Sequence, residues 1–188
     1  ARTMRNEAAE RAQFSKQIDS EDIHKLVPID NEISRLEKER AQVVAQIDLQ
    51  AIELDAETGA ITRTVDLFSL EAPDAIHKLN SYASPTPVLR DGRLYCHFGT
   101  FGTACVDAST GEVLWERVIP LEHGVGPGSS PFVHGDLLVL ICDGVDRQFV
   151  AALDRETGEP VWEVDRPEIR AESGDQKKSY CTPVVAPR

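Results

Sequence analysis

Polar side chains that could bind a ligand collect in short, often glycine-rich segments between apolar runs of the sequence. Imidazole and carboxylate groups can move protons or hold cations, and amide and guanidinium groups can bind polar or anionic ligands. Each also has a structural interpretation, because most polar side chains bond to backbone or water. The candidate ligand-binding residues are His77, Asn80, Ser81, His123, Asp143, Asp146 and Arg147.

The same residues do not form a recognisable catalytic or metal-binding motif. Asp143 and Asp146 look like a calcium-type carboxylate pair, but calcium takes about six to eight oxygen ligands. The spacing of the four cysteines fits no zinc pattern. The sequence contains no Gly-x-Ser-x-Gly elbow, no P-loop and no His-Glu-x-x-His. We therefore expect no catalytic residues and no metal site.

A repeated turn motif indicates how these segments are positioned. Asp-x-x-Thr-Gly occurs three times, each time after an apolar run, and a tryptophan follows four residues after the second and third glycines; the first copy has Arg63 there. Asp can accept hydrogen bonds from amides two or three residues on, and Gly takes the positive φ that closes the turn. The predicted structural residues are Asp55, Gly59, Asp107, Gly111, Trp115, Asp154, Gly158 and Trp162.

Further strand pairs precede the second and third turns, which makes four strands per unit of about 50 residues. We expect a mainly β fold, a partial β-propeller of four-stranded antiparallel blades, two complete and two incomplete. A bulky tryptophan between neighbouring blades is the expected filler. The predicted parts are 49–70 (last two strands of a first, partial blade), 84–118 and 129–165 (complete blades) and 179–188 (first strand of a further blade).

Residues 51–188 resemble the PQQ-like (pyrroloquinoline-quinone-like) β-propeller repeat family, whose blades read Ser-Pro-x-Val, Gly-x-x-Tyr and Ala-x-Asp-x-x-Thr-Gly-x-x-x-Trp. Asn80–Pro87 and Tyr95–Cys105 resemble a subgroup of large, secreted bacterial proteins of that type. The resemblance implies a propeller of about seven or eight blades, of which this chain is a fragment. It also implies a periplasmic or extracellular location, although no signal peptide is visible. In such blades, the links that carry the candidate residues emerge on one face, at the mouth of the central channel.

The sequence suggests a possible disulfide between Cys96 and Cys105. If Thr100 and Phe101 are the two residues of a tight turn, Cys96 faces Cys105 in a non-hydrogen-bonded pair with Cα atoms about 4.5 Å apart. That distance is within disulfide reach. The alternative, two buried thiols that act as small apolar side chains, stays open.

Residues 1–48 differ in character. From Asn31 to Ile47 the apolar or long side chains follow the three-four spacing of a coiled-coil surface, and a weaker pattern runs from Met4 to Ile18. We expect a helical hairpin, inserted within the first partial blade. It either covers the blade edge or serves as a partner-binding arm.

The net charge of −12 argues against nucleic acid or anionic lipid as a partner. No apolar run is long enough to span a membrane. The leading hypothesis is a non-catalytic extracytoplasmic scaffold or binding module with a protein partner and no cofactor. It would be similar in kind to the propeller lipoprotein of outer-membrane β-barrel assembly. The alternative is a quinoprotein-type periplasmic oxidoreductase, with PQQ and calcium, or a small-ligand sensor on the channel face.

Overall fold

The computed structural model describes residues 32, 46–71, 73–74 and 76–186. The helical hairpin predicted for residues 1–48 lies outside this part of the chain, except at its end. Residues 46–48, which the prediction assigns to the hairpin, belong to the first β-strand. Within the described residues, no helix has the length and apolar character needed to cross a bilayer.

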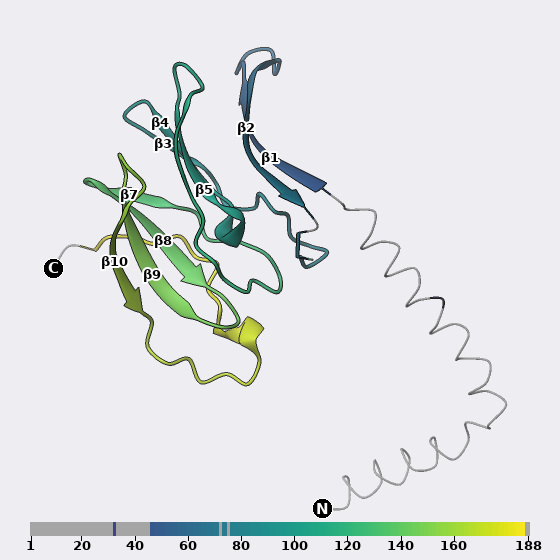
Figure 1. The fold of residues 1–188 in the computed structure, drawn as a ribbon, viewed down its shortest axis with the longest axis vertical. Coiled ribbons are helices and arrows are strands. Elements are labelled where there is room, and N and C mark those ends of the chain that lie inside the picture. Colours follow the sequence, from purple (N-terminus) through teal and green to yellow (C-terminus); the bar gives the residue numbers. More distant parts are fainter. Residues whose placement is uncertain (1–31, 33–45, 72, 75, 187–188) are drawn as a thin grey trace, which may run out of the picture. The chain divides into compact units, whose positions relative to one another are not determined.

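The described chain consists of ten strands and two short 3₁₀ helices, and the strands form three antiparallel sheets (Figure 1). The first sheet is β1–β2, the second is β3–β4–β5–β6 and the third is β7–β8–β9–β10, each joined in chain order. The elements are β1 (Gln46–Leu54), β2 (Ile61–Glu71), β3 (Val88–Arg90), β4 (Arg93–His97), η1 (Gly99–Phe101), β5 (Thr103–Asp107), β6 (Val113–Arg117), β7 (Phe132–His134), β8 (Leu137–Asp143), β9 (Gln148–Asp154), β10 (Pro160–Asp165) and η2 (Gly174–Lys177).

The two central strands of the second sheet, β4 and β5, are largely buried on both faces. Along a strand, successive side chains point to opposite sides, so Tyr95 and Cys105 pack toward the third sheet with Leu138 and Phe149. The alternate residues of β4 and β5, including Cys96, join Leu49 and Leu67 of the first sheet in a separate core. This arrangement explains why β4 and β5 read as nearly continuous buried runs instead of alternating apolar and polar residues.

All three Asp-x-x-Thr-Gly turns have the same hydrogen bonds. In the second turn, Asp107 Oδ1 accepts from the Ser109 and Thr110 amides at 2.8 and 2.9 Å. The Gly111 amide donates to the Asp107 carbonyl at 2.8 Å, and Gly111 has a φ of 79°. The turns that begin at Asp55 and Asp154 repeat both features. The motif therefore closes each hairpin with one carboxylate and one left-handed glycine.

The second and third turns each receive a side chain from the last strand of the preceding sheet. Trp115 of β6 is 9% exposed, and its indole N–H donates to the Arg155 carbonyl at 3.0 Å. A Cβ on Gly158 would lie 2.6 Å from the Trp115 ring. In the first sheet Arg63 takes the same place, and its guanidinium donates to two carbonyls of the next turn, those of Ala108 and Ser109, at 3.0 Å.

The strand register corrects the cysteine prediction. Cys96 pairs with Ala104 and Tyr95 with Cys105, and both thiols are free. The link is not a two-residue turn, because η1 intervenes and the Phe98 amide donates to the Gly102 carbonyl. That shift of one residue sends the two thiols to opposite faces of the sheet.

Residues 178–186 are not part of a strand. A strand assignment requires hydrogen bonds to a neighbouring strand, so the first strand of a further blade, predicted for 179–188, stays a prediction.

The turn carboxylates should make the stability of the fold depend on acid pH. Hydrogen bonds, first from the Ser109 hydroxyl and then from the Thr110 and Ser109 amides, lower the pKa of Asp107 to about 2 from 3.8. Because the folded pKa is the lower one, this stabilisation is present above about pH 3.8 and is lost as the pH falls toward about 2. Asp107→Asn keeps an acceptor oxygen but no charge, so its free energy of unfolding should fall less steeply below pH 4.

Urea unfolding between pH 5 and pH 2.5 measures this difference. Glu112→Gln removes one exposed charge from the same turn and corrects for net charge. Equal slopes for Asp107→Asn and the unaltered protein would contradict the account.

A glycine series should measure the contact between sheets. Gly59, Gly111 and Gly158 have φ values of 71°, 79° and 72°, so alanine meets the same backbone strain in each, about 1 kcal/mol. The surroundings differ: a Cβ meets nothing within 4 Å at Gly59, the flexible Arg63 side chain at 2.8 Å at Gly111, and the Trp115 ring at 2.6 Å at Gly158. We expect Gly158→Ala to cost about 2 kcal/mol more than Gly59→Ala, with Gly111→Ala between them.

Chemical denaturation of the three variants gives the order. Because Gly59→Ala carries the φ strain without the clash, it is the matched control, and equal losses at all three positions would rule out packing of Trp115 as the cause.

Candidate functional site

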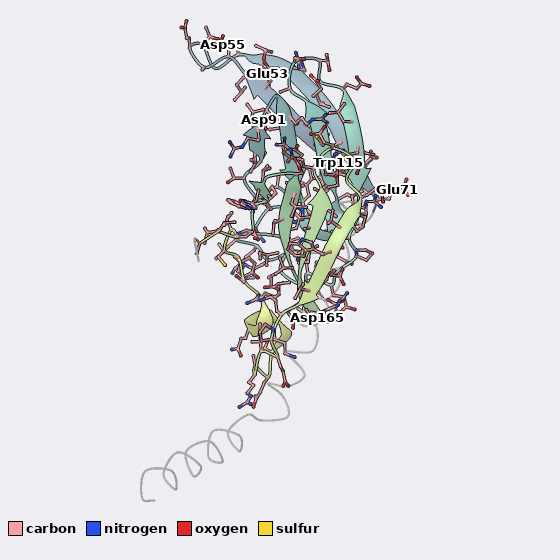
Figure 2. The ribbon with its side chains drawn as sticks, turned by 90° about the vertical axis from the view of Figure 1, so that its left-hand side faces the viewer. Glu53, Asp55, Glu71, Asp91, Trp115 and Asp165 are labelled. Carbon is pink, nitrogen blue, oxygen red and sulfur yellow. The ribbon has the colours of Figure 1, made fainter. Side chains whose placement is uncertain are left out.

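Five loop segments meet at one end of the sheets, which we call the loop cluster: residues 76–81, 99–101, 121–130, 143–148 and 178–181. Figure 2 shows Asp55 and Asp91 at the turn end of the sheets and Asp165 at the opposite end, where these segments lie. Backbone hydrogen bonds hold the cluster together, with the His77 amide donating to Val125 and the Val145 amide to Glu122. These segments therefore lie together at one end of the sheets.

Asn80 joins two of the segments with its side-chain amide. The Nδ2 group donates to the Val125 and Pro127 carbonyls at 2.8 and 3.0 Å, and Oδ1 accepts from the Ser81 amide at 2.9 Å. The exposed His77 is engaged locally, since its Nδ1 accepts from the Leu79 amide at 3.2 Å. These hydrogen bonds hold the loops in their conformation.

His123 lies at the centre of the loop cluster. Its Nε2 accepts from the Thr100 amide at 3.0 Å, which requires the proton of a neutral imidazole to sit on Nδ1. Burial, followed by the positive charge of Lys178, lowers its pKa to about 4, although Asp146 acts in the opposite direction. His123 is therefore neutral at pH 7 in a defined tautomer.

Asp143 ends β8 and is 4% exposed. Its Oδ2 accepts from the Ser179 amide at 2.7 Å and forms an ion pair with Arg166. Burial raises the pKa of this carboxyl, and the contacts with Ser179 and Arg166 oppose that rise. Asp143 thus ties the segment 178–181 to the third sheet.

The other three predicted residues lie in the same loop segments but make their contacts with other groups, although Asp146 is close enough to raise the pKa of His123. Arg147 is exposed, pairs with Glu163 and Asp165 of β10 at 2.6 Å, and has its guanidinium carbon 4.4 Å from the centre of the Phe149 ring. Asp146 accepts from the Glu122 amide at 3.1 Å. Ser81 is exposed and takes part in a turn with Ser84. The structure therefore brings together four of the seven predicted residues: His77, Asn80, His123 and Asp143.

Sequence reasoning did not select His97, although it lies beside this centre. His97 ends β4, is 6% exposed, and shares a hydrogen bond between its Nδ1 and Thr103 Oγ1 at 2.8 Å. Burial, and then the proximity of His123, lowers its pKa to about 4. A histidine within a strand otherwise filled with buried residues is a signal that could have found it. Arg166 and Tyr180, also missed, carry no such signal, because their contacts depend on the path of loops.

Two cavities share Pro127, Gly128 and Tyr180 in the loop cluster. The open one has a volume of about 340 Å³, and beneath it lies a small polar one of about 10 Å³. The open cavity is lined by His77, Leu79, Asn80, Val125, Pro127, Gly128 and Tyr180. The small cavity adds His97, His123 and Asp143 among its lining residues.

A further cavity of about 350 Å³ lies away from these groups, between the first and second sheets near the Asp107 turn. Its lining is mostly apolar, with Glu53, Arg63 and Asp107 as its charged residues. Because it holds none of the histidines, it offers no comparable chemistry.

Comparison with known proteins identifies the family. Residues 50–182 match the PQQ_2 family model, which is described as outer membrane protein assembly factor BamB. No curated protein matches the chain significantly.

Several solved structures are similar to this chain at low sequence identity. BamB from Moraxella catarrhalis is 18% identical with a TM-score of 0.52, over 76% of this chain and 41% of that chain. The quinohemoprotein alcohol dehydrogenase ADHIIG from Pseudomonas putida HK5 is 20% identical with a TM-score of 0.46, over 62% of this chain and 18% of that one. The quinohemoprotein alcohol dehydrogenase from Comamonas testosteroni is 19% identical with a TM-score of 0.44, over 64% and 19%.

The chain spans less than half the length of each of these structures, so their similarity to it does not establish its activity or its partners. The family match covers well over half of the sequence and coincides with the repeated turns, the four-stranded antiparallel sheets and the tryptophan between them. The chain therefore belongs to the PQQ_2 family, and these residues form a PQQ-like propeller repeat segment.

Proposed function

We propose that this protein is a non-catalytic scaffold or binding module that acts outside the cytoplasm and engages a protein partner through the loop cluster. The observation that supports this proposal most is that the polar side chains of the loop cluster form hydrogen bonds with the backbone. Asn80 donates to backbone carbonyls of a neighbouring loop, and His123 and Asp143 each accept a hydrogen bond from a backbone amide of another loop. Groups held in this way shape a surface and are poorly placed to act on a substrate. The family description and the similarity to BamB support the location and the role.

The open cavity gives this surface a place for an apolar side chain. Leu79 and Tyr180 on its lining are 85% and 47% exposed, while Asn80 and His77 supply polar groups at its rim. Apolar and aromatic residues around a concave site, with polar groups beside them, are typical of the energetic centre of a protein interface. The net charge of −12 disfavours anionic partners.

The alternative, a quinoprotein-type oxidoreductase, requires carboxylates free to hold calcium beside the quinone. Asp143 is engaged by Arg166 and Ser179, and Asp146 accepts a backbone amide. In the part of the chain that the structure describes, no three His, Cys, Asp or Glu side chains are grouped for a metal. These residues do not fit a calcium–quinone site. A small-ligand sensor would use the open cavity, in competition with the proposed partner.

The first test uses the full-length protein. We expect no absorbance from a bound quinone and no calcium-dependent dye reduction when pyrroloquinoline quinone and Ca²⁺ are added. Either signal would replace the scaffold proposal by the oxidoreductase alternative.

The second test separates a structural from a ligand-binding role for Asn80. Asn80→Ala removes the side-chain donor to the Val125 and Pro127 carbonyls, of which Val125 keeps the His77 amide, so we expect a loss of about 2 kcal/mol and a fall in Tm of about 6 °C. Ser81→Ala, at the exposed neighbour, is the control and should shift Tm far less. If Asn80→Ala abolishes binding of a small ligand at unchanged Tm, Asn80 belongs to a ligand site.

The third test follows from the neutral histidines. His97 has a pKa of about 4 in the folded protein against 6.5 in the unfolded chain. A lowered histidine pKa means that its stabilisation is complete above about pH 6.5 and is lost as the pH falls toward 4, by up to about 3 kcal/mol. His97→Asn retains a group at the position of Nδ1 but does not titrate, so this part of the pH dependence should disappear.

Unfolding free energies at pH 7 and pH 5 test this expectation. His134→Asn, at an exposed turn of the third sheet, is the matched control. An NMR titration that placed the His97 pKa near its ordinary value would contradict the structural role.

A further inference from the structure

We propose that the small cavity of the loop cluster is a binding site for one water molecule, which accepts a hydrogen bond from His123 Nδ1–H and donates one to Asp143 Oδ1. The site is separate from the partner-binding role proposed above. It follows from two buried polar atoms on two residues that line the same cavity.

The tautomer of His123 defines the donor. Since Nε2 accepts from the Thr100 amide, the proton of the neutral ring is on Nδ1. His123 Nδ1 is buried, and no described residue accepts its proton. A buried N–H without an acceptor costs free energy, so the geometry calls for an acceptor at this point.

Asp143 supplies the complementary acceptor. Oδ2 is used by Ser179 and Arg166, whereas Oδ1 is buried and receives no hydrogen bond from the residues described. The whole residue is only 4% exposed, so bulk water does not satisfy this oxygen. Donor and acceptor thus line the same cavity.

The size of the cavity selects the ligand. Its volume of about 10 Å³ matches the space that one water requires, about 10–15 Å³. Larger polar ligands are excluded by volume. An ammonium ion is of similar size but has only donors, so it cannot accept from Nδ1–H. Water can accept and donate at once.

The site lies where three parts of the chain meet. His123 belongs to the link between the second and third sheets, Asp143 ends β8, and Ser179 precedes the C-terminal residues of the described chain. One water at this point completes the hydrogen bonding of two groups that hold these parts together. We expect it to exchange slowly with solvent, because the lining residues bury both of its partners.

NMR of the full chain tests the site directly. We expect ¹⁵N shifts that place the His123 proton on Nδ1, and a nuclear Overhauser effect between that proton and a long-lived water. A proton on Nε2 would overturn the proposal. So would a crystal structure in which His123 Nδ1 donates directly to Asp143 Oδ1.

A matched pair of variants measures the contribution of the carboxylate. Asp143→Asn can keep its carbonyl toward Ser179 but then presents an amide donor to the water. Because one charge-assisted hydrogen bond is lost, the residence time from water magnetic relaxation dispersion should shorten by about tenfold. Asp146→Asn removes an exposed carboxylate from the same loop, also near His123, and should leave the residence time within about twofold.

An unchanged residence time in Asp143→Asn, or equal shortening in both variants, would contradict the site. If Asp143→Asn does not fold, the unaltered protein still decides the matter. A crystal structure should then show water density at about 2.7–3.2 Å from both His123 Nδ1 and Asp143 Oδ1. Density at neither atom would refute the proposal.

Discussion

The arrangement of this protein depends on one contact, made when a side chain from the last strand of one sheet packs on the Asp–Gly turn of the next. The contact exists because the turn glycine has no side chain: Trp115 lies directly against Gly158 and donates to the carbonyl of Arg155. The Asp154 carboxylate holds the turn in the one shape that leaves this space open. The same turn conformation thus closes the hairpin and makes room for the side chain of the preceding sheet.

The opposite end of the sheets follows a different rule. There the links between strands are long and irregular. Polar side chains, together with a few backbone hydrogen bonds, hold these links to one another. Asn80 donates hydrogen bonds to two backbone carbonyls, and His123 and Asp143 each accept one from a backbone amide. The imidazole of His123 and the carboxylate of Asp143, groups often found in catalytic sites, are here engaged in hydrogen bonds with backbone amides. These hydrogen bonds join segments that are far apart in the sequence and so maintain the geometry of the loops.

The sequence predicts well what depends on neighbours in the chain. The carboxylate of Asp107 bonds amides two and three residues on, so the motif alone specifies the turn and the position of Trp115 after it. Prediction fails where a link has an unexpected length. The 3₁₀ helix after His97 shifts the register by one residue and separates Cys96 from Cys105. Pairs such as Asp143 with Arg166 join distant loops, and no local pattern encodes them.

The two contacts between sheets differ in chemistry, although they occupy the same place in the repeat. At the turn, Trp115 supplies an aromatic ring to one contact, whereas Arg63 supplies a guanidinium that donates to the carbonyls of Ala108 and Ser109 in the other. Exposing apolar surface raises the heat capacity and exposing polar surface lowers it. Both contacts also bury an apolar core, so the difference arises at the turns: exposure of the Trp115 ring adds to the heat-capacity change of opening, and exposure of the Arg63 guanidinium subtracts from it. Warming and cooling consequently shift the relative strength of the two contacts within one chain.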